Sequence, residues 1–91
     1  MRQVHVIVSG RVQGVGFRSF TQQIAIQNDI VGWVKNLDDG SVEIEAQGED
    51  NKVDTFLMQV KKGPSFFAKV KNIEITEEDV KTAFQKFEIK Y

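Results

Sequence analysis

The 91-residue chain has room for one domain, close to the smallest size at which a core folds without disulfides or metal ions, and this excludes a two-domain enzyme. Its 41% hydrophobic and 27% charged residues are typical of a globular domain rather than a disordered or coiled-coil chain. Twelve basic against thirteen acidic residues give a formal net charge of -1, so no overall field attracts nucleic acid or an anionic membrane.

Several kinds of site are also excluded by residue type. Cysteine is absent and His5 is the single histidine, which excludes disulfides, thiol catalysis and metal centres built from Cys or several His side chains. No apolar run approaches the ~18 residues of a membrane span, and residues 1–5 lack the apolar core of a signal peptide. We therefore expect a soluble cytoplasmic protein with no metal site.

The first expected element is a central strand, because Val4, Val6 and Val8 alternate along a segment rich in β-branched residues. Residues 10–18, Gly-Arg-Val-Gln-Gly-Val-Gly-Phe-Arg, contain three glycines and follow neither a helical nor a strand period. This segment is expected to be a loop with special backbone needs.

A helix is expected to follow, because the apolar residues from Phe17 to Ala25 recur at helical spacing. It should end near residues 27–29, Gln-Asn-Asp, where Asn and Asp tolerate a left-handed cap. Residues 30–34 and 42–46 then predict two strands. The connector at 36–40, Asn-Leu-Asp-Asp-Gly, ends in the Asp-Gly pair of a tight reversal, which predicts an antiparallel hairpin.

The second expected helix has apolar residues at i, i+3, i+4 and i+7 between Val53 and Val60, with Asp50 placed to cap its start and Gly63-Pro64 placed to stop it. A strand is expected over 68–75, with a bulge near Asn72 where its alternation breaks.

A short polar helical or turn segment over residues 77–83 and a final strand over 87–91 complete the chain. The order β-α-β-β-α-β predicts an α+β, ferredoxin-like sandwich: a mostly antiparallel sheet with two helices on one face. That fold carries many unrelated functions, so function must come from a site.

The segment from Gln13 to Arg18 is the strongest candidate for such a site. A glycine loop that enters a helix offers unpaired backbone N–H groups and the positive end of the helix dipole to an anion. Gly14 and Gly16 let the main chain approach a phosphate closely. Arg18 adds a planar fork of donors that can hold two phosphate oxygens together.

Other interpretations of these residues stay open at this point. Two glycines alone also fit a tight structural turn, and Asn36 beside a hairpin fits a purely conformational role. Trp33 is most simply a core or face-covering aromatic residue. His5 has no acidic neighbour in sequence and fits a structural or surface role, and the acidic pairs fit turns and solvated surface.

Three segments in combination resemble the acylphosphatase family over nearly the whole chain. They are Val-Ser-Gly-Arg-Val-Gln-Gly-Val-Gly-Phe-Arg at 8–18, Gly-Trp-Val-Lys-Asn at 32–36 and Asp-Gly-Ser-Val-Glu at 39–43. The resemblance implies a ferredoxin-like fold, one acylphosphatase-like domain over residues 1–91, hydrolysis of the carboxyl–phosphate bond of acyl phosphates, and no metal or organic cofactor.

The resemblance also implies which residues act. It makes Arg18 the phosphate-binding arginine and Asn36 the residue that orients the attacking water. The backbone that cradles the phosphate then belongs to Gln13, Gly14, Val15, Gly16 and Phe17. The partners implied are a small acyl phosphate as substrate and inorganic phosphate as product, with no nucleic acid or membrane, and a monomer is expected.

An acyl phosphate is an activated compound, because its leaving group is a carboxylate, so positioning and charge stabilisation suffice for catalysis. Asn36 does not titrate, and the water proton is expected to pass to the substrate or solvent.

Two other functions are open to a domain of this fold: a non-catalytic module that binds a phosphorylated or carboxylated ligand, and an RNA-binding domain. The presence of both Arg18 and Asn36 favours the enzyme, and the acidic pI of 5.8 disfavours RNA binding.

Overall fold

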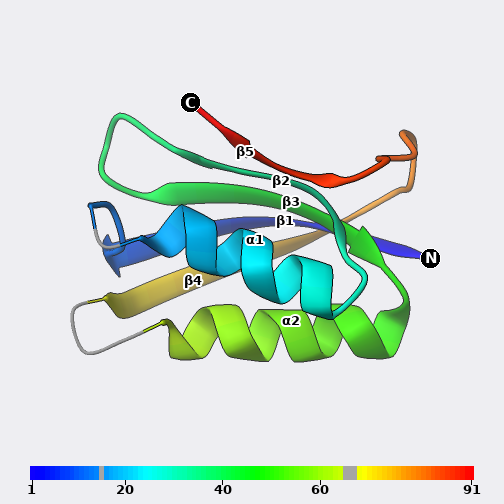
Figure 1. Ribbon diagram of the computed structural model, residues 1–91, viewed down its shortest axis with the longest axis horizontal. Helices are drawn as coiled ribbons and strands as arrows, with labels where there is room; N and C mark the ends of the chain where they lie inside the picture. Colours follow the sequence, from blue (N-terminus) through cyan, green and yellow to red (C-terminus); the bar gives the residue numbers. More distant parts are fainter. Residues whose placement is uncertain (15, 65–67) are drawn as a thin grey trace.

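A five-stranded sheet covered on one face by two helices makes up the protein (Figure 1). The computed structural model describes residues 1–14, 16–64 and 68–91. In chain order the elements are β1 (Arg2–Arg11), α1 (Phe17–Gln27), β2 (Val31–Asn36), β3 (Val42–Gly48), α2 (Asp50–Lys62), β4 (Lys69–Glu78) and β5 (Phe87–Lys90).

The sheet order is β4-β1-β3-β2-β5. β1 pairs antiparallel with both β3 and β4, and β2 pairs antiparallel with β3, while β5 runs parallel to β2 at the edge. The predicted ferredoxin-like class is therefore confirmed, as are the central place of β1 and the β2–β3 hairpin. β1 and β2 run in the same direction on either side of β3, so the C-terminal ends of both strands lie at the same end of the sheet.

The core lies between the sheet and the helices. Side chains of a strand alternate between two faces, and the residues at alternate positions of β1 and β3 on the helix side are fully buried: Val4, Val6, Val8, Val42, Ile44 and Ala46. The apolar stripes of the helices cover them, with Phe17, Ile24 and Ala25 from α1 and Val53, Phe56 and Val60 from α2. Neither described helix is long and apolar enough to cross a membrane.

The helix ends agree with the predictions except at the start of α2. Asp29 has a φ of 56°, the left-handed conformation expected after α1. Gly63 has a φ of 81° directly after α2 and ends that helix as expected. The predicted cap at Asp50 is wrong, because Asp50 is already helical and Glu49 occupies the cap position without a side-chain hydrogen bond. The Asp50 carboxylate instead lies in the first turn, where its negative charge interacts favourably with the positive end of the helix dipole.

The fourth strand is longer than predicted. The pairing passes from Ser9 with Asn72 to Gly10 with Val70, which leaves Lys71 without a partner and confirms the bulge. The helical or turn segment predicted over 77–83 is wrong, because Glu77 and Glu78 extend β4 beside β1.

Residues 79–86 form no helix or strand, and a buried glutamine holds them against the sheet. Gln47 Nε2 donates to the Thr82 carbonyl at 2.6 Å, and Gln47 Oε1 accepts from the Phe84 N–H at 3.3 Å. A single side chain thus satisfies two backbone groups of the irregular segment, which needs no turn of helix to be ordered.

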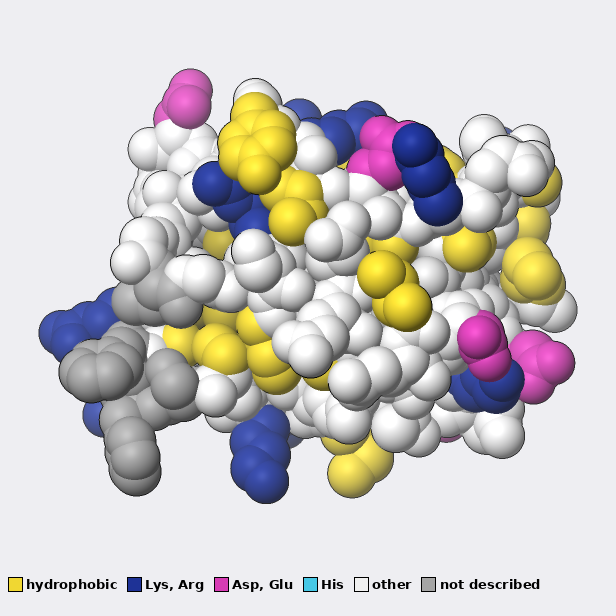
Figure 2. All heavy atoms as spheres, in the orientation of Figure 1, with side chains coloured by type: hydrophobic (Ala, Val, Ile, Leu, Met, Phe, Trp, Pro, Cys, Tyr) yellow, Lys and Arg dark blue, Asp and Glu magenta, His cyan; other side chains and the backbone are white. Residues whose placement is uncertain are grey.

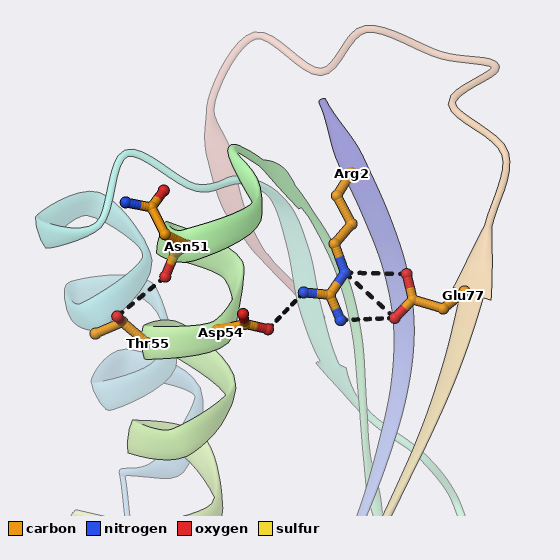
Figure 3. A network of polar contacts seen from close by, with 5 residues as sticks. All are labelled: Arg2, Asn51, Asp54, Thr55 and Glu77. Atoms are coloured by element: carbon orange, nitrogen blue, oxygen red, sulfur yellow. Dashed lines mark hydrogen bonds and ion pairs between the residues drawn. The ribbon is translucent and has the colours of Figure 1, made fainter.

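Arg2 joins three elements at the end of the sheet where the chain begins (Figure 3). Its guanidinium donates to the Glu77 carboxylate of β4 at 2.7 Å and to the Asp54 carboxylate of α2 at 2.5 Å. The Arg2 guanidinium holds the pKa of Glu77 below its ordinary value. These contacts fix α2 over β1 and β4 at the end remote from the glycine loop.

The sheet face without helices carries polar and charged side chains. His5 Nε2 lies 2.7 Å from Glu43 Oε2, and Gln3 Nε2 donates to Glu45 Oε2 at 3.1 Å. Burial raises the pKa of the Glu45 carboxyl to about 7, and a hydrogen bond with Glu78 acts in the same direction. Trp33 covers part of this face, as expected, with the Lys90 ammonium 4.6 Å from its ring centroid.

The raised pKa of Glu45 predicts a pH dependence of stability. The folded protein binds a proton at Glu45 more tightly than the unfolded chain, in which the pKa of this carboxyl is 4.5. Glu45 therefore stabilises the fold most below pH 4.5, and this stabilisation is lost as the pH rises through about 7. We expect Glu45→Gln to remove the loss, with a gain over the wild type on the order of 1 kcal/mol at pH 8 after solvent screening.

Urea unfolding of both proteins between about pH 4 and pH 8 measures this difference. The matched control is Glu74→Gln, an exposed carboxylate on β4, whose curve should run parallel to that of the wild type. Parallel curves for Glu45→Gln and the wild type over the same range would contradict the prediction.

Candidate active site

Three segments distant in sequence meet at one end of the molecule: the loop after β1, the β2–β3 hairpin and the C-terminus (Figure 1). They surround a hollow of about 120 Å³. The first segment and the start of α1 contribute Val12, Gly14, Gly16, Phe17, Arg18 and Ser19, and the other two contribute Asn36, Ile89 and Tyr91. The predicted pair Arg18 and Asn36 is therefore brought together.

The glycine loop has the backbone that an anion site requires. Gly14 and Gly16 have φ values of 74° and 77°, in the left-handed region that only glycine adopts readily. Gly16 occupies the N-cap position of α1, so the first N–H groups of the helix have no partner within the helix and lie beside the hollow. Val15, predicted to belong to this cradle, lies outside the described residues.

Phe17 anchors the loop to the core. Its side chain is only 1% exposed and its ring centroid lies 5.9 Å from that of Phe20. With the side chain fixed in the core, the Phe17 backbone is the part that faces the hollow. The prediction that Phe17 serves the cradle through its backbone is therefore compatible with the burial of its ring.

Arg18 is half-buried and held by the end of β5. Its Nη1 donates to the Lys90 carbonyl at 3.1 Å, and its Cζ lies 4.6 Å from the centroid of the Tyr91 ring. A cation over an aromatic ring is attracted by the negative face of that ring. These two contacts hold the guanidinium beside the glycine loop before any ligand is bound.

Asn36 is the last residue of β2. Its Oδ1 is buried and accepts no hydrogen bond from any described residue. A buried acceptor without a donor costs about 1–3 kcal/mol, and native proteins rarely keep one without a functional reason. Since this oxygen belongs to a residue that lines the hollow, it is placed to receive a donor from a bound molecule.

The sequence predicts that the backbone of Gln13 belongs to the cradle and assigns no role to its side chain. That side chain donates from Nε2 to the carbonyls of Leu37 and Ser41, at 2.7 and 2.8 Å, and Gln13 is not among the described residues that line the hollow. Both acceptors belong to the hairpin loop directly after Asn36. Gln13 thus ties the glycine loop to the hairpin, so that the two predicted halves of the site hold a fixed separation.

Two further residues of the hollow, Ile89 and Tyr91, were expected only as parts of a final strand. β5 ends at Lys90, one residue short of the predicted strand, and Tyr91 directly follows it. A spacing of two in an extended chain places Ile89 and Tyr91 on one face, and that signal is present in the sequence. The sequence does not reveal which strand pairs with β5, because that contact joins residues more than 50 positions apart in the chain: Gly32 pairs with Phe87.

Within residues 1–14, 16–64 and 68–91, no three His, Cys, Asp or Glu side chains cluster in a way that could hold a metal ion.

Comparison with known proteins agrees with this geometry. The family model described as Acylphosphatase matches residues 4–89. The chain belongs to the acylphosphatase family. A curated acylphosphatase from Oceanobacillus iheyensis is 60% identical over 91 residues, which cover the whole of both chains.

Solved structures agree as well. The crystal structure of an acylphosphatase from Bacillus subtilis superposes with a TM-score of 0.95 at 48% identity, again over the whole of both chains. Full-length HypF in its phosphate- and nucleotide-bound form matches 99% of this chain with 12% of its own, at 28% identity and a TM-score of 0.87. The acylphosphatase fold therefore occurs both as a chain of this size and as a small part of a larger protein.

The Gln13 contacts generate a prediction about the site. In Gln13→Leu both hydrogen bonds are lost, and we expect the free energy of unfolding to fall by about 1–3 kcal/mol. Because small displacements of aligned groups can cost up to about a hundredfold in rate, we also expect kcat for acyl phosphate hydrolysis to fall roughly tenfold to a hundredfold.

The matched control is Gln22→Leu. Gln22 lies on α1, is half-buried, and donates from its side chain to the Phe87 carbonyl at 3.0 Å, away from the hollow. This variant should lose stability and keep its kcat. If Gln13→Leu and Gln22→Leu lose equal stability and both keep kcat, Gln13 has no part in aligning the site.

Proposed function

We propose that Arg18, Asn36 and the backbone amides of the Gln13–Phe17 loop carry the acylphosphatase activity of this protein. The observation that supports this most strongly is the buried Oδ1 of Asn36, which accepts no hydrogen bond from a described residue and belongs to the same hollow as Arg18 and the glycine loop. The hollow thus offers donors for a phosphoryl group and an acceptor for a water molecule.

The phosphoryl oxygens of the substrate bind to the loop amides and to the Arg18 guanidinium. Gly14 and Gly16 leave the amides uncovered, and the N-terminus of α1 adds its dipole. Arg18 is held by the Lys90 carbonyl and the Tyr91 ring, so its charge needs little reorganisation when the phosphoryl group arrives. Charge that develops on the phosphoryl oxygens in the transition state is stabilised by the same donors.

Asn36 holds the attacking water. The water donates one hydrogen bond to Oδ1, which leaves an oxygen lone pair to attack phosphorus in line with the leaving carboxylate. The P–O bond to the water oxygen forms as the P–O bond to the carboxylate breaks. Both water protons end on the phosphate, so an acyl phosphate dianion and water give a carboxylate and dihydrogen phosphate, which then equilibrates with solvent.

The reaction needs neither a general base nor a covalent nucleophile on the protein, because the carboxylate leaves without protonation. Arg18 and the loop amides supply the charge stabilisation that kinases and ATPases obtain from a metal ion. No cofactor is therefore part of the proposal.

The partners of the proposed enzyme are few. Its substrate is a small acyl phosphate and its product inorganic phosphate. All residues of the proposed site come from one chain and one domain, which supports a monomer that works alone, and we propose that it does so in the cytoplasm without nucleic acid or membrane partners.

Substitution of the two side chains tests the proposal. We expect Arg18→Ala to lower kcat/KM for an aryl acyl phosphate by about a hundredfold to a thousandfold, the cost of removing one preorganised charge donor. Arg18→Lys should recover little of this, because an ammonium lacks the planar fork. Asn36→Ala should lower kcat more than it weakens inhibition by inorganic phosphate, since Asn36 contacts the water rather than the phosphoryl group.

Release of carboxylate with a chelator present measures these rates, and circular dichroism checks that each variant is folded. Arg11→Ala and Asn51→Ala serve as controls, since both replace exposed side chains outside the hollow and should leave the rates unchanged. Near-normal turnover of both Arg18→Ala and Asn36→Ala would remove the assignment. A rate governed by a protein group that titrates near neutrality would contradict the proposed route of the proton.

A further inference from the structure

The hollow is too small to enclose both halves of an aryl acyl phosphate. Its volume is about 120 Å³, whereas a cavity of ~150 Å³ holds a single benzene molecule. A phosphoryl group and the attacking water fill such a space. The acyl half of the substrate must therefore lie against the rim of the hollow.

Most of the described rim offers an acyl group no apolar surface. Val12 and Phe17 are apolar, but each is only 1% exposed. Gly14 and Gly16 have no side chain, and Arg18, Ser19 and Asn36 are polar. These residues therefore give a carbon-rich group little to pack against.

The end of β5 is different. Tyr91 is 99% exposed and Ile89 is half-buried, and both line the hollow. In Figure 2 an apolar side chain projects from the surface next to basic side chains, at the end of the molecule where the C-terminus lies in Figure 1. A large exposed apolar side chain beside a polar hollow is a feature of ligand-binding rims.

The position of the Tyr91 ring is tied to that of the phosphate-binding residue. The ring centroid lies 4.6 Å from Cζ of Arg18, and the preceding residue, Lys90, accepts a hydrogen bond from Arg18 Nη1. A phosphoryl group held by Arg18 thus brings its acyl substituent close to the ring. An aromatic acyl group at that place can pack against Tyr91, and an alkyl group can pack against Ile89.

We propose that Ile89 and Tyr91 form an acyl subsite that selects acyl phosphates with aromatic or extended apolar acyl groups over those with the smallest ones. This inference rests on the proposed function, because it takes the phosphoryl group to be held by Arg18. Tyr91 is then a specificity-determining residue that contacts the acyl group, in addition to its contact with Arg18.

The test compares two substrates that share the phosphoryl group and differ in the acyl group, benzoyl phosphate and acetyl phosphate. Since a pair of aromatic rings adds a modest attraction beyond burial, Tyr91→Ala should lower the ratio of their kcat/KM values by about twofold to tenfold. Tyr91→Phe keeps the ring and should keep the ratio. Met58→Ala removes another large exposed apolar side chain, from α2, and should change neither rate.

Inhibition by inorganic phosphate distinguishes the acyl subsite from the contact with Arg18, because phosphate has no acyl group. The inference is overturned if Tyr91→Ala lowers both kcat/KM values by the same factor, with a matching loss of phosphate inhibition, since Tyr91 then acts only by holding Arg18. An unchanged ratio with unchanged phosphate inhibition overturns it as well. Failure of the proposed function is a separate result: the wild type then hydrolyses neither substrate, or Arg18→Ala hydrolyses both at the normal rate.

Discussion

The direction of two strands determines where the proposed active site lies. β1 and β2 both pair antiparallel with β3, so they run parallel to each other and end at the same edge of the sheet. Val42 at the start of β3 pairs with Val8 on one side and with Asn36 on the other. Asn36 is therefore about 10 Å, two strand spacings, from the strand that leads into the glycine loop. Gln13 fixes this distance, because its side chain reaches the hairpin from that loop.

The local parts of the proposed site could be predicted from the sequence, and the side-chain contacts that join them could not. The glycine loop, Arg18 and Asn36 lie in short segments whose residue types suit the proposed chemistry. The direction of the Gln13 side chain and the position of Tyr91 depend on which strands are neighbours, which local patterns do not reveal. The same holds for the fold: periodicity predicted the elements, whereas the cap at Asp50 and the helical or turn segment at 77–83 were wrong, the second because Glu77 and Glu78 found a partner strand in β1.

The two faces of the sheet carry different ionisable side chains. The open face carries a carboxyl group with a pKa raised to about 7, Glu45, and the pair of His5 and Glu43. The hollow, on the helix side, is lined among the described residues by one charged side chain, Arg18, and by no carboxylate or imidazole side chain. Stability and turnover should therefore depend on pH through different groups. This separation suits a site whose chemistry rests on a permanent cation and a neutral amide.

One hollow is proposed to bind the phosphoryl group through the loop amides and Arg18. A titration of the isotopically labelled protein with inorganic phosphate, followed by the backbone and side-chain amide signals in a ¹H–¹⁵N NMR spectrum, tests this binding directly. We expect saturable shifts of the Gly14, Gly16 and Phe17 amides together with the Asn36 side-chain amide, all of them lost in Arg18→Ala. Saturable shifts confined to the open face of the sheet, or shifts at the loop that persist without Arg18, would contradict it.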